Sequence, residues 1–278
     1  MKILVTGSLG QLGREVLKQG KAHQCLGVDR NELDITNIKQ VQECFQTWKP
    51  DAVVHCAAYT QVDRAEEEVE EAYAINAAGA QNIAAACLEA NARMVHISTD
   101  YVFDGKGSEP YTEEKAVNPQ SVYGKSKYLG EERVRQILGR HYILRTAWLY
   151  GEGANFVKTM LRLAQNQEPL RVVNDQFGTP TSTEDLTKAI YRLLAADAYG
   201  TYHATCQGSC SWYDFACEIF KQANVAKHVI PVSSDEFVRP APRPAYSVMD
   251  NRMLRLTVGD PMGPWKSALS SYLRQLQG

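Results

Sequence analysis

Apolar runs rich in β-branched residues alternate with amphipathic segments through the first half of the chain. The runs are apolar on both faces, which is typical of strands buried in a parallel sheet. We expect strands at 3–6, 25–29, 52–58, 94–99 and 142–146. We expect helices around 15–17 and at 38–48, 65–91 and 121–138, the third broken near Asn76 and Gly79. This alternation predicts an α/β fold with a doubly wound parallel sheet.

The second half of the chain has a less regular pattern. It predicts helices at 155–165, 183–196, 212–223 and 265–276 and a short strand at 170–173. The proline-rich segment 239–244 fits neither a helix nor a central strand, so we expect a surface loop there. We therefore divide the chain near residue 150. Residues 151–278 are expected to form mainly a smaller, discontinuous domain, with about 170–200 returning to the first.

Composition excludes several classes of protein. Of 278 residues, 44% are hydrophobic and 22% charged, which is ordinary for a soluble globular protein. The formal net charge of -2 argues against nucleic acid or an anionic membrane as a partner. No apolar run approaches the roughly 20 residues of a membrane span, and no signal-peptide pattern opens the chain, so we expect a cytoplasmic protein. The seven cysteines are scattered without zinc-site spacing, so we expect reduced thiols and no bound metal.

A glycine-rich turn directly follows the first predicted strand. Gly7, Gly10 and Gly13 give the spacing G-x-x-G-x-x-G, with Gln11 and Leu12 between the last two. Glycines in such a turn bring backbone N–H groups and a helix N-terminus close to a pyrophosphate. The turn therefore predicts that residues 1–150 bind a dinucleotide such as NADPH or NADH.

The end of the second predicted strand faces the adenosine half of such a cofactor. Asp29 follows Gly13 by sixteen residues, where a carboxylate would bond the ribose hydroxyls. Arg30 follows at once and suits a 2′-phosphate, so the preference between NADH and NADPH stays open. Asp34 and Ile35 are either contacts to the adenine or a turn aspartate beside a core isoleucine.

The end of the third predicted strand is another candidate for the cofactor site. Ala57, Ala58 and Tyr59 close that strand, and the two small alanines leave room for a ligand. The crevice outside the carboxyl ends of the strands is where doubly wound sheets bind their ligands.

Two tyrosine–lysine pairs with a spacing of four residues are present. Tyr123 and Lys127 open a periodic helix with Ser121 as its cap, whereas Tyr111 and Lys115 lie in a loop-like stretch. Side chains four apart share one face of a helix, so the ammonium would favour the ionised phenol and lower its pKa. Together with the hydroxyl of Thr99, which ends the fourth predicted strand, the first pair predicts a nicotinamide-dependent reductase.

Longer strings resemble the dTDP-4-dehydrorhamnose reductases, which belong to the extended short-chain dehydrogenase/reductase family. The strings are STDYVFDG at 98–105, VYGKSK at 122–127, RTAWLY at 145–150, NDQFGTPT at 174–181 and RPAYS at 243–247. The resemblance runs from residue 1 to about 275. It implies a Rossmann-type domain followed by a substrate domain.

The resemblance also implies a reaction. It is the reduction of the C4 ketone of dTDP-4-dehydro-β-L-rhamnose by NADPH or NADH, the last step of dTDP-rhamnose synthesis for cell-surface polysaccharide. Tyr123 would supply the proton to the developing alkoxide. Lys127 would bond the nicotinamide ribose and lower the Tyr123 pKa, while Thr99 would bond the same oxygen or the phenol.

Further contacts are implied at matching positions. The cofactor would also meet Asn76 and Ser98. The dTDP-sugar would be bound by Thr99, Asp100, Trp148, Asn155, Gln176 and Arg243.

Some members of the family dimerise through magnesium held by glutamates. Glu15 and Glu184 match two of those positions, but the third falls near Lys266. A cation there would repel a divalent metal, so we do not expect the magnesium-bridged dimer. The resemblance leaves monomer and homodimer open.

Two other functions remain open from the sequence. One is a non-catalytic nucleotide-binding subunit similar to the methionine adenosyltransferase regulatory subunit, which shares this fold. The other keeps the chemistry but changes the sugar, as in reductases or epimerases of other nucleotide sugars.

Overall fold

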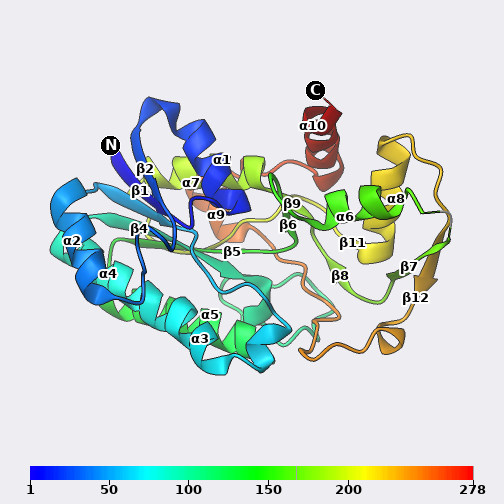
Figure 1. Cartoon of the computed structure of the whole chain (residues 1–278), viewed down its shortest axis with the longest axis horizontal. Coiled ribbons are helices and arrows are strands. Elements are labelled where there is room, and N and C mark those ends of the chain that lie inside the picture. The colour runs from blue at the N-terminus through cyan, green and yellow to red at the C-terminus, as the bar shows by residue number, and fades with distance from the viewer. Residues whose placement is uncertain (167, 278) are drawn as a thin grey trace.

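A six-stranded parallel sheet forms the centre of the computed structural model, which describes residues 1–166 and 168–277 (Figure 1). Across the sheet the strand order is β2-β1-β3-β4-β5-β10. The strands are β1 (Lys2–Thr6), β2 (Gln24–Val28), β3 (Ala52–His55), β4 (Arg93–Thr99), β5 (His141–Thr146) and β10 (Gly200–His203). The predicted doubly wound α/β fold is confirmed.

Helices cover both faces of this sheet. On one face lie α1 (Gln11–Gln19) and α7 (Thr183–Leu194); on the other lie α2 (Ile38–Trp48), α4 (Ala80–Glu89) and α5 (Val122–Ile137) (Figure 1). In β1, Ile3 and Val5 pack toward the first face and Leu4 toward the second. Successive side chains of a strand point to opposite faces, so a strand covered twice must be apolar throughout.

The long helical segment is interrupted as the sequence predicted. It begins with a 3₁₀ turn, η2 (Arg64–Glu66), and continues as α3 (Val69–Tyr73), a π-helical turn η3 (Ala74–Gly79) and α4. Within the π turn, the buried Asn76 side chain bonds both backbone groups of Tyr59 and the hydroxyl of Ser126. The interruption therefore ties the loop after β3 to helix α5.

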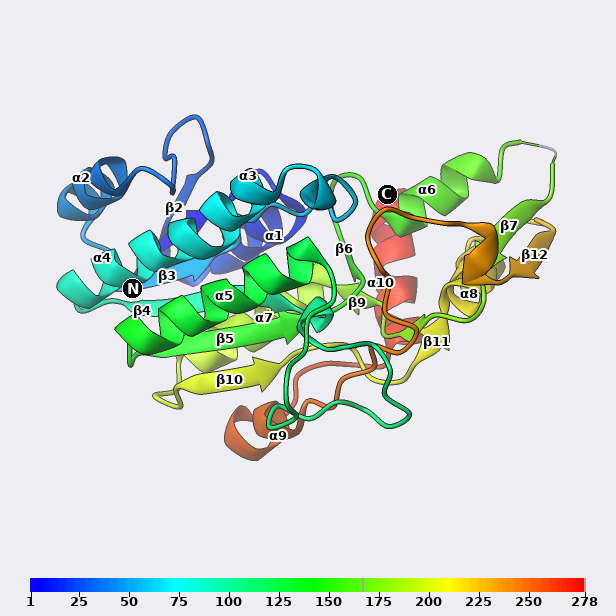
Figure 2. The ribbon, with the colours of Figure 1, turned by 90° about the horizontal axis from the view of Figure 1, so that it is seen from below.

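A smaller unit lies beside the carboxyl ends of the strands (Figure 2). It contains α6 (Phe156–Leu163), α8 (Trp212–Gln222) and the strand pairs β7 (Leu170–Val173) with β12 (Val229–Val232) and β8 (Phe177–Gly178) with β11 (Cys210–Ser211). The pair β6 (Leu149–Tyr150) and β9 (Thr181–Ser182) and helix α10 (Trp265–Gln277) lie between this unit and the sheet. Because β7 pairs with β12, the chain returns to the sheet at α7 rather than at residue 170.

The sequence pattern missed several elements, among them the two-residue strands β6, β8, β9 and β11, and lengthened β3. Strand β10 and helix α9 (Arg252–Val258), which pack together, were not predicted, nor was β12, where Pro231 is tolerated because only β7 pairs with it. Strand β3 ends at His55, three residues before the predicted end. The remaining short turns are η1 (Gly20–Ala22), η4 (Asp100–Val102) and η5 (Ser234–Glu236).

No helix in the described part of the chain combines the length and apolarity that crossing a bilayer requires.

Candidate active site

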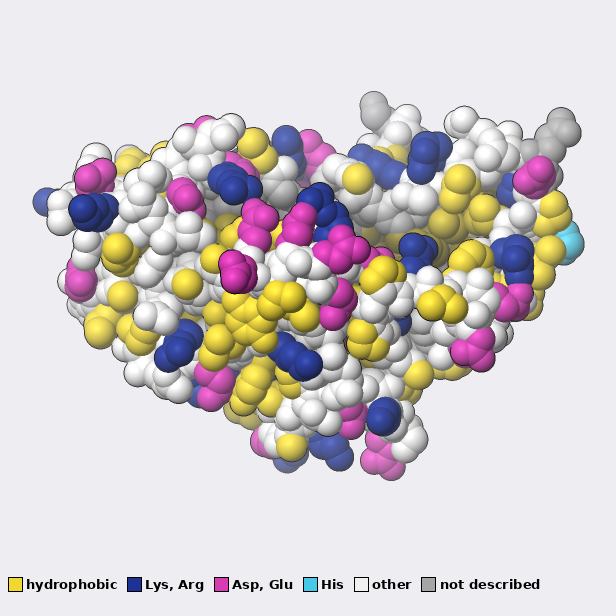
Figure 3. Space-filling model, turned by 60° about the horizontal axis from the view of Figure 1, so that its bottom comes forward, with side chains coloured by type: hydrophobic (Ala, Val, Ile, Leu, Met, Phe, Trp, Pro, Cys, Tyr) yellow, Lys and Arg dark blue, Asp and Glu magenta, His cyan; other side chains and the backbone are white. Residues whose placement is uncertain are grey.

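A cavity of about 1620 Å³ opens at the carboxyl ends of the strands, between the sheet and the smaller unit. Its walls include Thr6 from β1, Cys56 after β3, Thr99 from β4 and Thr146 from β5. The neighbouring strands β1 and β3 mark the point where the strand order reverses, which is the expected ligand site of this architecture. Acidic and basic side chains lie side by side on this surface, where the two parts of the molecule meet (Figure 3).

The glycine turn fits a dinucleotide pyrophosphate. Gly7 has a φ of +65°, and a Cβ on Gly13 would lie 2.3 Å from the Gly7 carbonyl oxygen, so side chains at these positions would disrupt the turn. Helix α1 starts at Gln11, and within the described chain no side chain caps it and no acidic residue stands in its first turn. Its N-terminal N–H groups and dipole therefore suit a phosphate.

Asp29 and Arg30 both line the cavity, but they are held differently. The Asp29 carboxylate accepts a hydrogen bond from the Leu9 N–H, at 3.0 Å, which fixes the glycine turn to the end of β2. The Arg30 side chain is 77% exposed and lies 3.5 Å from Glu71. An ion pair this exposed is weak, so the guanidinium remains available to an anion.

We expect Arg30→Ala to raise the KM for NADPH far more than the KM for NADH, because only NADPH carries a 2′-phosphate. Steady-state kinetics with each cofactor tests this, with Arg255→Ala as the control, since Arg255 pairs with Asp250 and does not line the cavity. Equal effects on the two cofactors would mean that Arg30 does not meet the adenosine half.

Asp34 and Ile35 also line the cavity, although their main contacts are within the protein. The Asp34 carboxylate accepts hydrogen bonds from the N–H and the hydroxyl of Thr36, which lower its pKa. Ile35 is buried in the core on the α2 side of the sheet. These contacts match the second alternative given above, a turn aspartate beside a core isoleucine.

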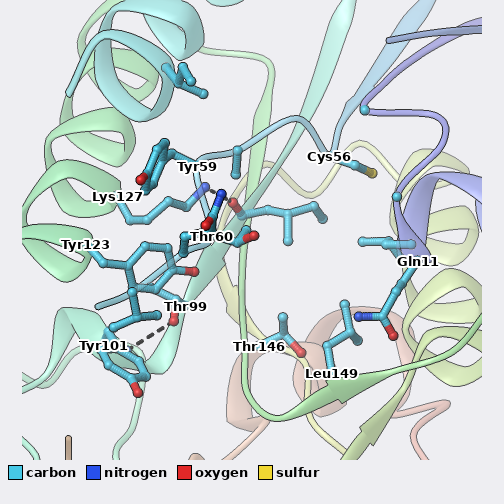
Figure 4. Close-up of a pocket in the computed structure, with 18 of the residues that line it drawn as sticks. Gln11, Cys56, Tyr59, Thr60, Thr99, Tyr101, Tyr123, Lys127, Thr146 and Leu149 are labelled. Carbon is cyan, nitrogen blue, oxygen red and sulfur yellow. Dashed lines mark hydrogen bonds between the residues drawn. The ribbon is translucent and has the colours of Figure 1, made fainter. Parts of the chain in front are cut away.

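The phenol of Tyr123 faces the cavity from the first turn of α5 (Figure 4). Ser121 caps the helix by accepting from the Gly124 N–H, at 3.1 Å, so the predicted cap is confirmed. The ring of Tyr101 meets the Tyr123 ring edge-on, with the centroids 5.4 Å apart. Both the cap and this packing fix the orientation of the phenol.

Lys127 lies one turn farther along α5 but does not bond the phenol. Its ammonium donates to the Ile97 carbonyl oxygen at 2.6 Å, and burial lowers its pKa to about 8. The pKa of Tyr123 is raised to about 12, mainly by burial; the Thr99 hydroxyl lowers it and the Asp100 charge adds to the rise. The prediction that Lys127 lowers this pKa is therefore wrong in this structure, because a backbone carbonyl holds the ammonium.

Thr99 stands between Tyr123 and Tyr101 at the end of β4 (Figure 4). Its hydroxyl donates to Asp100 Oδ1 at 2.9 Å and accepts from the Tyr101 N–H at 3.2 Å. Thr99 is 5% exposed and Asp100 3% exposed. Burial raises the pKa of Asp100 to about 6, against the lowering effect of the Ser247 and Thr99 hydroxyls.

Trp148 forms the wall of the cavity next to the smaller unit. Its indole stacks on Trp212 with the centroids 3.5 Å apart, and its backbone is left-handed, with a φ of +47°. A Cβ on Gly178 would lie 2.5 Å from the indole, which explains the glycine in the NDQFGTPT string. Backbone strain of this kind costs about 1–3 kcal/mol and tends to occur at functional sites.

Arg243 connects the smaller unit with the nucleotide side of the cavity. Its guanidinium lies 2.8 Å from the Asp63 carboxylate, which also accepts from the Ala241 N–H at 3.3 Å. Asp63 belongs to the loop between β3 and η2. Gln176, directly before β8, donates to the Ser234 hydroxyl at 2.9 Å.

All but two of the residues predicted to form the site line this one cavity. They include Ala57, Ala58 and Tyr59 after β3 and Ser98 in β4. Asn76 and Asn155 do not line it. Asn76 binds Tyr59 and Ser126, as described above, and Asn155 caps α6 through the Lys158 N–H and bonds Tyr272.

The second tyrosine–lysine pair lies outside the cavity lining. Tyr111 donates to Asp104 at 2.9 Å, accepts from the Gly107 N–H at 2.8 Å, and stacks on Phe103. These contacts give Tyr111 a structural role in the loop after η4.

The predicted position of Lys266 relative to the two glutamates is wrong. Lys266 lies 3.9 Å from Glu218 on α8, and Gln275 is the residue of α10 that bonds Glu184, at 3.0 Å. Within residues 1–166 and 168–277, no group of three or more His, Cys, Asp or Glu side chains is arranged to hold a metal.

From the smaller unit's side of the cavity the sequence predicted Gln176 and Arg243 but missed several other residues. Aromatic and basic side chains gather there from distant segments: Phe156, Arg171, Trp212, Phe237 and Arg239. The one available signal was the aromatic residue at the start of two helices, Phe156 and Trp212, since a side chain in a first turn can point past the helix end.

The fold and this site define a class: a nicotinamide-dependent oxidoreductase of the short-chain dehydrogenase/reductase type. Residues 1–277 match the family model described as the RmlD substrate binding domain. The chain is 51% identical to the crystal structure of a dTDP-4-dehydrorhamnose reductase from Clostridium acetobutylicum, which covers 100% of both chains with a TM-score of 0.98. The protein belongs to the dTDP-4-dehydrorhamnose reductase family.

Two further relatives are informative. The dTDP-4-dehydrorhamnose reductase of Bacillus anthracis, solved in complex with NADP, is 44% identical over 99% of each chain, with a TM-score of 0.97. A spore coat polysaccharide biosynthesis protein of Bacillus subtilis is 42% identical over 99% of this chain and 97% of its own length.

Proposed function

We propose that this protein reduces the C4 ketone of dTDP-4-dehydro-β-L-rhamnose to dTDP-L-rhamnose with NADPH or NADH. This is the last step of dTDP-rhamnose synthesis, which supplies a precursor of cell-surface polysaccharide. The observation that carries the proposal is the grouping of Thr99, Tyr123 and Lys127 beside the glycine turn in one cavity. The named relatives, similar over the full chain, support the same substrate.

When bound, the reduced nicotinamide would supply the hydride that adds to the sugar C4. Tyr123 gives its proton to the ketone oxygen as negative charge develops on it. General acid catalysis of this kind typically increases the reaction rate by about 10²–10⁴-fold. Lys127 binds the nicotinamide ribose and lies on the same face of α5 as Tyr123. The glycine turn holds the pyrophosphate, while Asp29 and Arg30 meet the adenosine half.

The smaller unit suits the rest of a dTDP-sugar. Trp148, Trp212 and Phe156 offer aromatic faces, and Arg171, Arg239 and Arg243 offer guanidinium groups for a diphosphate. A catalytically silent regulatory subunit would not need this set of groups beside a proton donor. These groups therefore favour an enzyme over a regulatory subunit.

The decisive assay follows NADPH or NADH oxidation with dTDP-4-dehydrorhamnose made by the preceding pathway enzymes. We expect oxidation that depends on the complete substrate mixture and a product with the chromatographic behaviour of dTDP-L-rhamnose. Omitting the enzyme that inverts the sugar tests for a different nucleotide sugar, because full activity without it would assign another substrate. No oxidation with either cofactor, despite cofactor binding, would favour the regulatory subunit.

A further inference from the structure

We propose that Asp100 is a positioning residue that holds the single hydroxyl proton of Thr99, withholds it from the Tyr123 phenolate and so keeps Tyr123 a proton donor. The proposal rests on the proposed function, because it concerns the direction of proton transfer in ketone reduction. It assigns to Asp100 a role distinct from contact with the sugar.

The Thr99 hydroxyl can donate a single hydrogen bond, and in this structure it donates that bond to Asp100. A threonine hydroxyl has one proton and two lone pairs. The proton points to Asp100 Oδ1 at 2.9 Å, and one lone pair accepts from the Tyr101 N–H at 3.2 Å. The remaining lone pair can accept from a protonated phenol, whereas donation to a phenolate would require Thr99 to give up its bond to Asp100.

Asp100 is held in place for this task. Its side chain is 3% exposed, so it cannot turn freely into water. Oδ2, its other oxygen, is buried and has no hydrogen-bond partner in the described residues, while Oδ1 accepts from Thr99. The Ser247 hydroxyl also lowers the pKa of this carboxyl but leaves Oδ2 without a bond. An unsatisfied buried carboxylate competes strongly for a nearby proton donor.

Other ionisable groups around the phenol do not replace this effect. Lys127 on the same helix is held by the Ile97 carbonyl, and the Tyr59 phenol from the loop after β3 donates to Glu68. Tyr101 faces the phenol edge-on, and beyond it Arg243 and Asp63 neutralise each other. Asp100 is therefore the nearest uncompensated negative charge.

The pH dependence has a definite sign. Asp100 disfavours the phenolate by its charge and by keeping the Thr99 proton, and both effects raise the pKa of Tyr123. Ketone reduction needs the protonated phenol, and the reverse oxidation needs the phenolate. Loss of Asp100 should therefore move the basic limb of reduction and the acidic limb of oxidation to lower pH.

The experiment compares Asp100→Asn and Asp100→Ala with the wild type, recording kcat against pH in both directions. Asparagine loses the charge but its amide oxygen still accepts from Thr99; alanine loses both. We expect both limbs to move down in the order wild type, Asp100→Asn, Asp100→Ala, by on the order of one pH unit in total. Cofactor affinity, measured by fluorescence without substrate, should be unchanged and verifies that the cofactor site is intact.

Thr99→Val supplies the internal test. Without the Thr99 hydroxyl there is no proton to withhold. In the Thr99→Val background, the limbs of the kcat–pH profile should therefore lie at the same pH for Asp100→Asn and Asp100→Ala. Asp104→Asn is the matched control, because Asp104 accepts from the phenol of Tyr111 outside the cavity, and its profile should coincide with the wild type.

Limbs that stay in place while the substrate KM rises would overturn the proposal and leave Asp100 as a sugar contact. Limbs that move to higher pH would also overturn it. A wild type inactive in both directions would instead refute the proposed function, since the proposal requires an active parent enzyme.

Discussion

Tyr123→Phe is expected to abolish most of the turnover while leaving the fold and the cofactor affinity intact. The substitution removes the proton donor but keeps the ring that packs edge-on against Tyr101. General acid–base groups typically contribute about 10²–10⁴-fold, so kcat should fall by that order. The measurement is kcat at saturating substrate, with cofactor binding determined separately.

Tyr111→Phe provides the comparison within the same chain. It removes an equivalent hydroxyl, but that hydroxyl bonds Asp104 and Gly107 and does not line the cavity. We expect kcat within a few-fold of the wild type. If Tyr111→Phe lost the activity and Tyr123→Phe kept it, the assignment of the active site would be wrong.

Arg145→Met is expected to lower the free energy of unfolding by about 3–5 kcal/mol. This is the largest change in stability that we predict for this protein. The Arg145 guanidinium binds the Glu131 carboxylate through two hydrogen bonds, at 2.9 and 2.7 Å. The two side chains are only 4% and 0% exposed. Removing the arginine leaves a buried carboxylate without its main counter-charge. Urea denaturation of the cofactor-free protein measures the change.

Arg255→Met is the matched control, because Arg255 forms an ion pair with Asp250 in which the side chains are 48% and 33% exposed. Exposed pairs contribute about 0–1 kcal/mol, so the loss should not exceed that range. Adding Glu131→Leu to Arg145→Met should recover part of the lost stability, since it removes the uncompensated charge. No recovery would show that packing rather than charge governs this site.

The core of the fold was predictable because its strands are apolar on both faces. The consecutive apolar residues Ile3, Leu4 and Val5 indicate a strand covered on both faces, even when its neighbouring strands are unknown. Strand β10 was not predictable in this way. Its residues, Gly-Thr-Tyr-His, are ordered by pairing with β5, which no local pattern encodes.

The grouping of the proposed catalytic tyrosine and lysine was predictable because it is also local in sequence. Tyr123 and Lys127 lie within one helix and Ser121 caps it, so spacing alone relates them. The partner of Lys127 is a backbone carbonyl from β4, which sequence cannot identify, and so the predicted effect on the phenol was wrong. The prediction of Asn155 as a substrate contact has a different difficulty. In sequence, an asparagine that caps a helix cannot be distinguished from one that binds a ligand.

The bond between Arg243 and Asp63 makes the cavity sensitive to dissolved salt. This side-chain ion pair joins the segment between η5 and α9 to the loop carrying Tyr59, and both partners are partly exposed. At physiological ionic strength charges are screened over about 8 Å, so added salt weakens such a pair. A substrate diphosphate would compete with Asp63 for the same guanidinium. The connection between these two segments of the cavity wall should therefore depend on both ionic strength and substrate, and rates measured in different buffers would describe differently restrained forms of one enzyme.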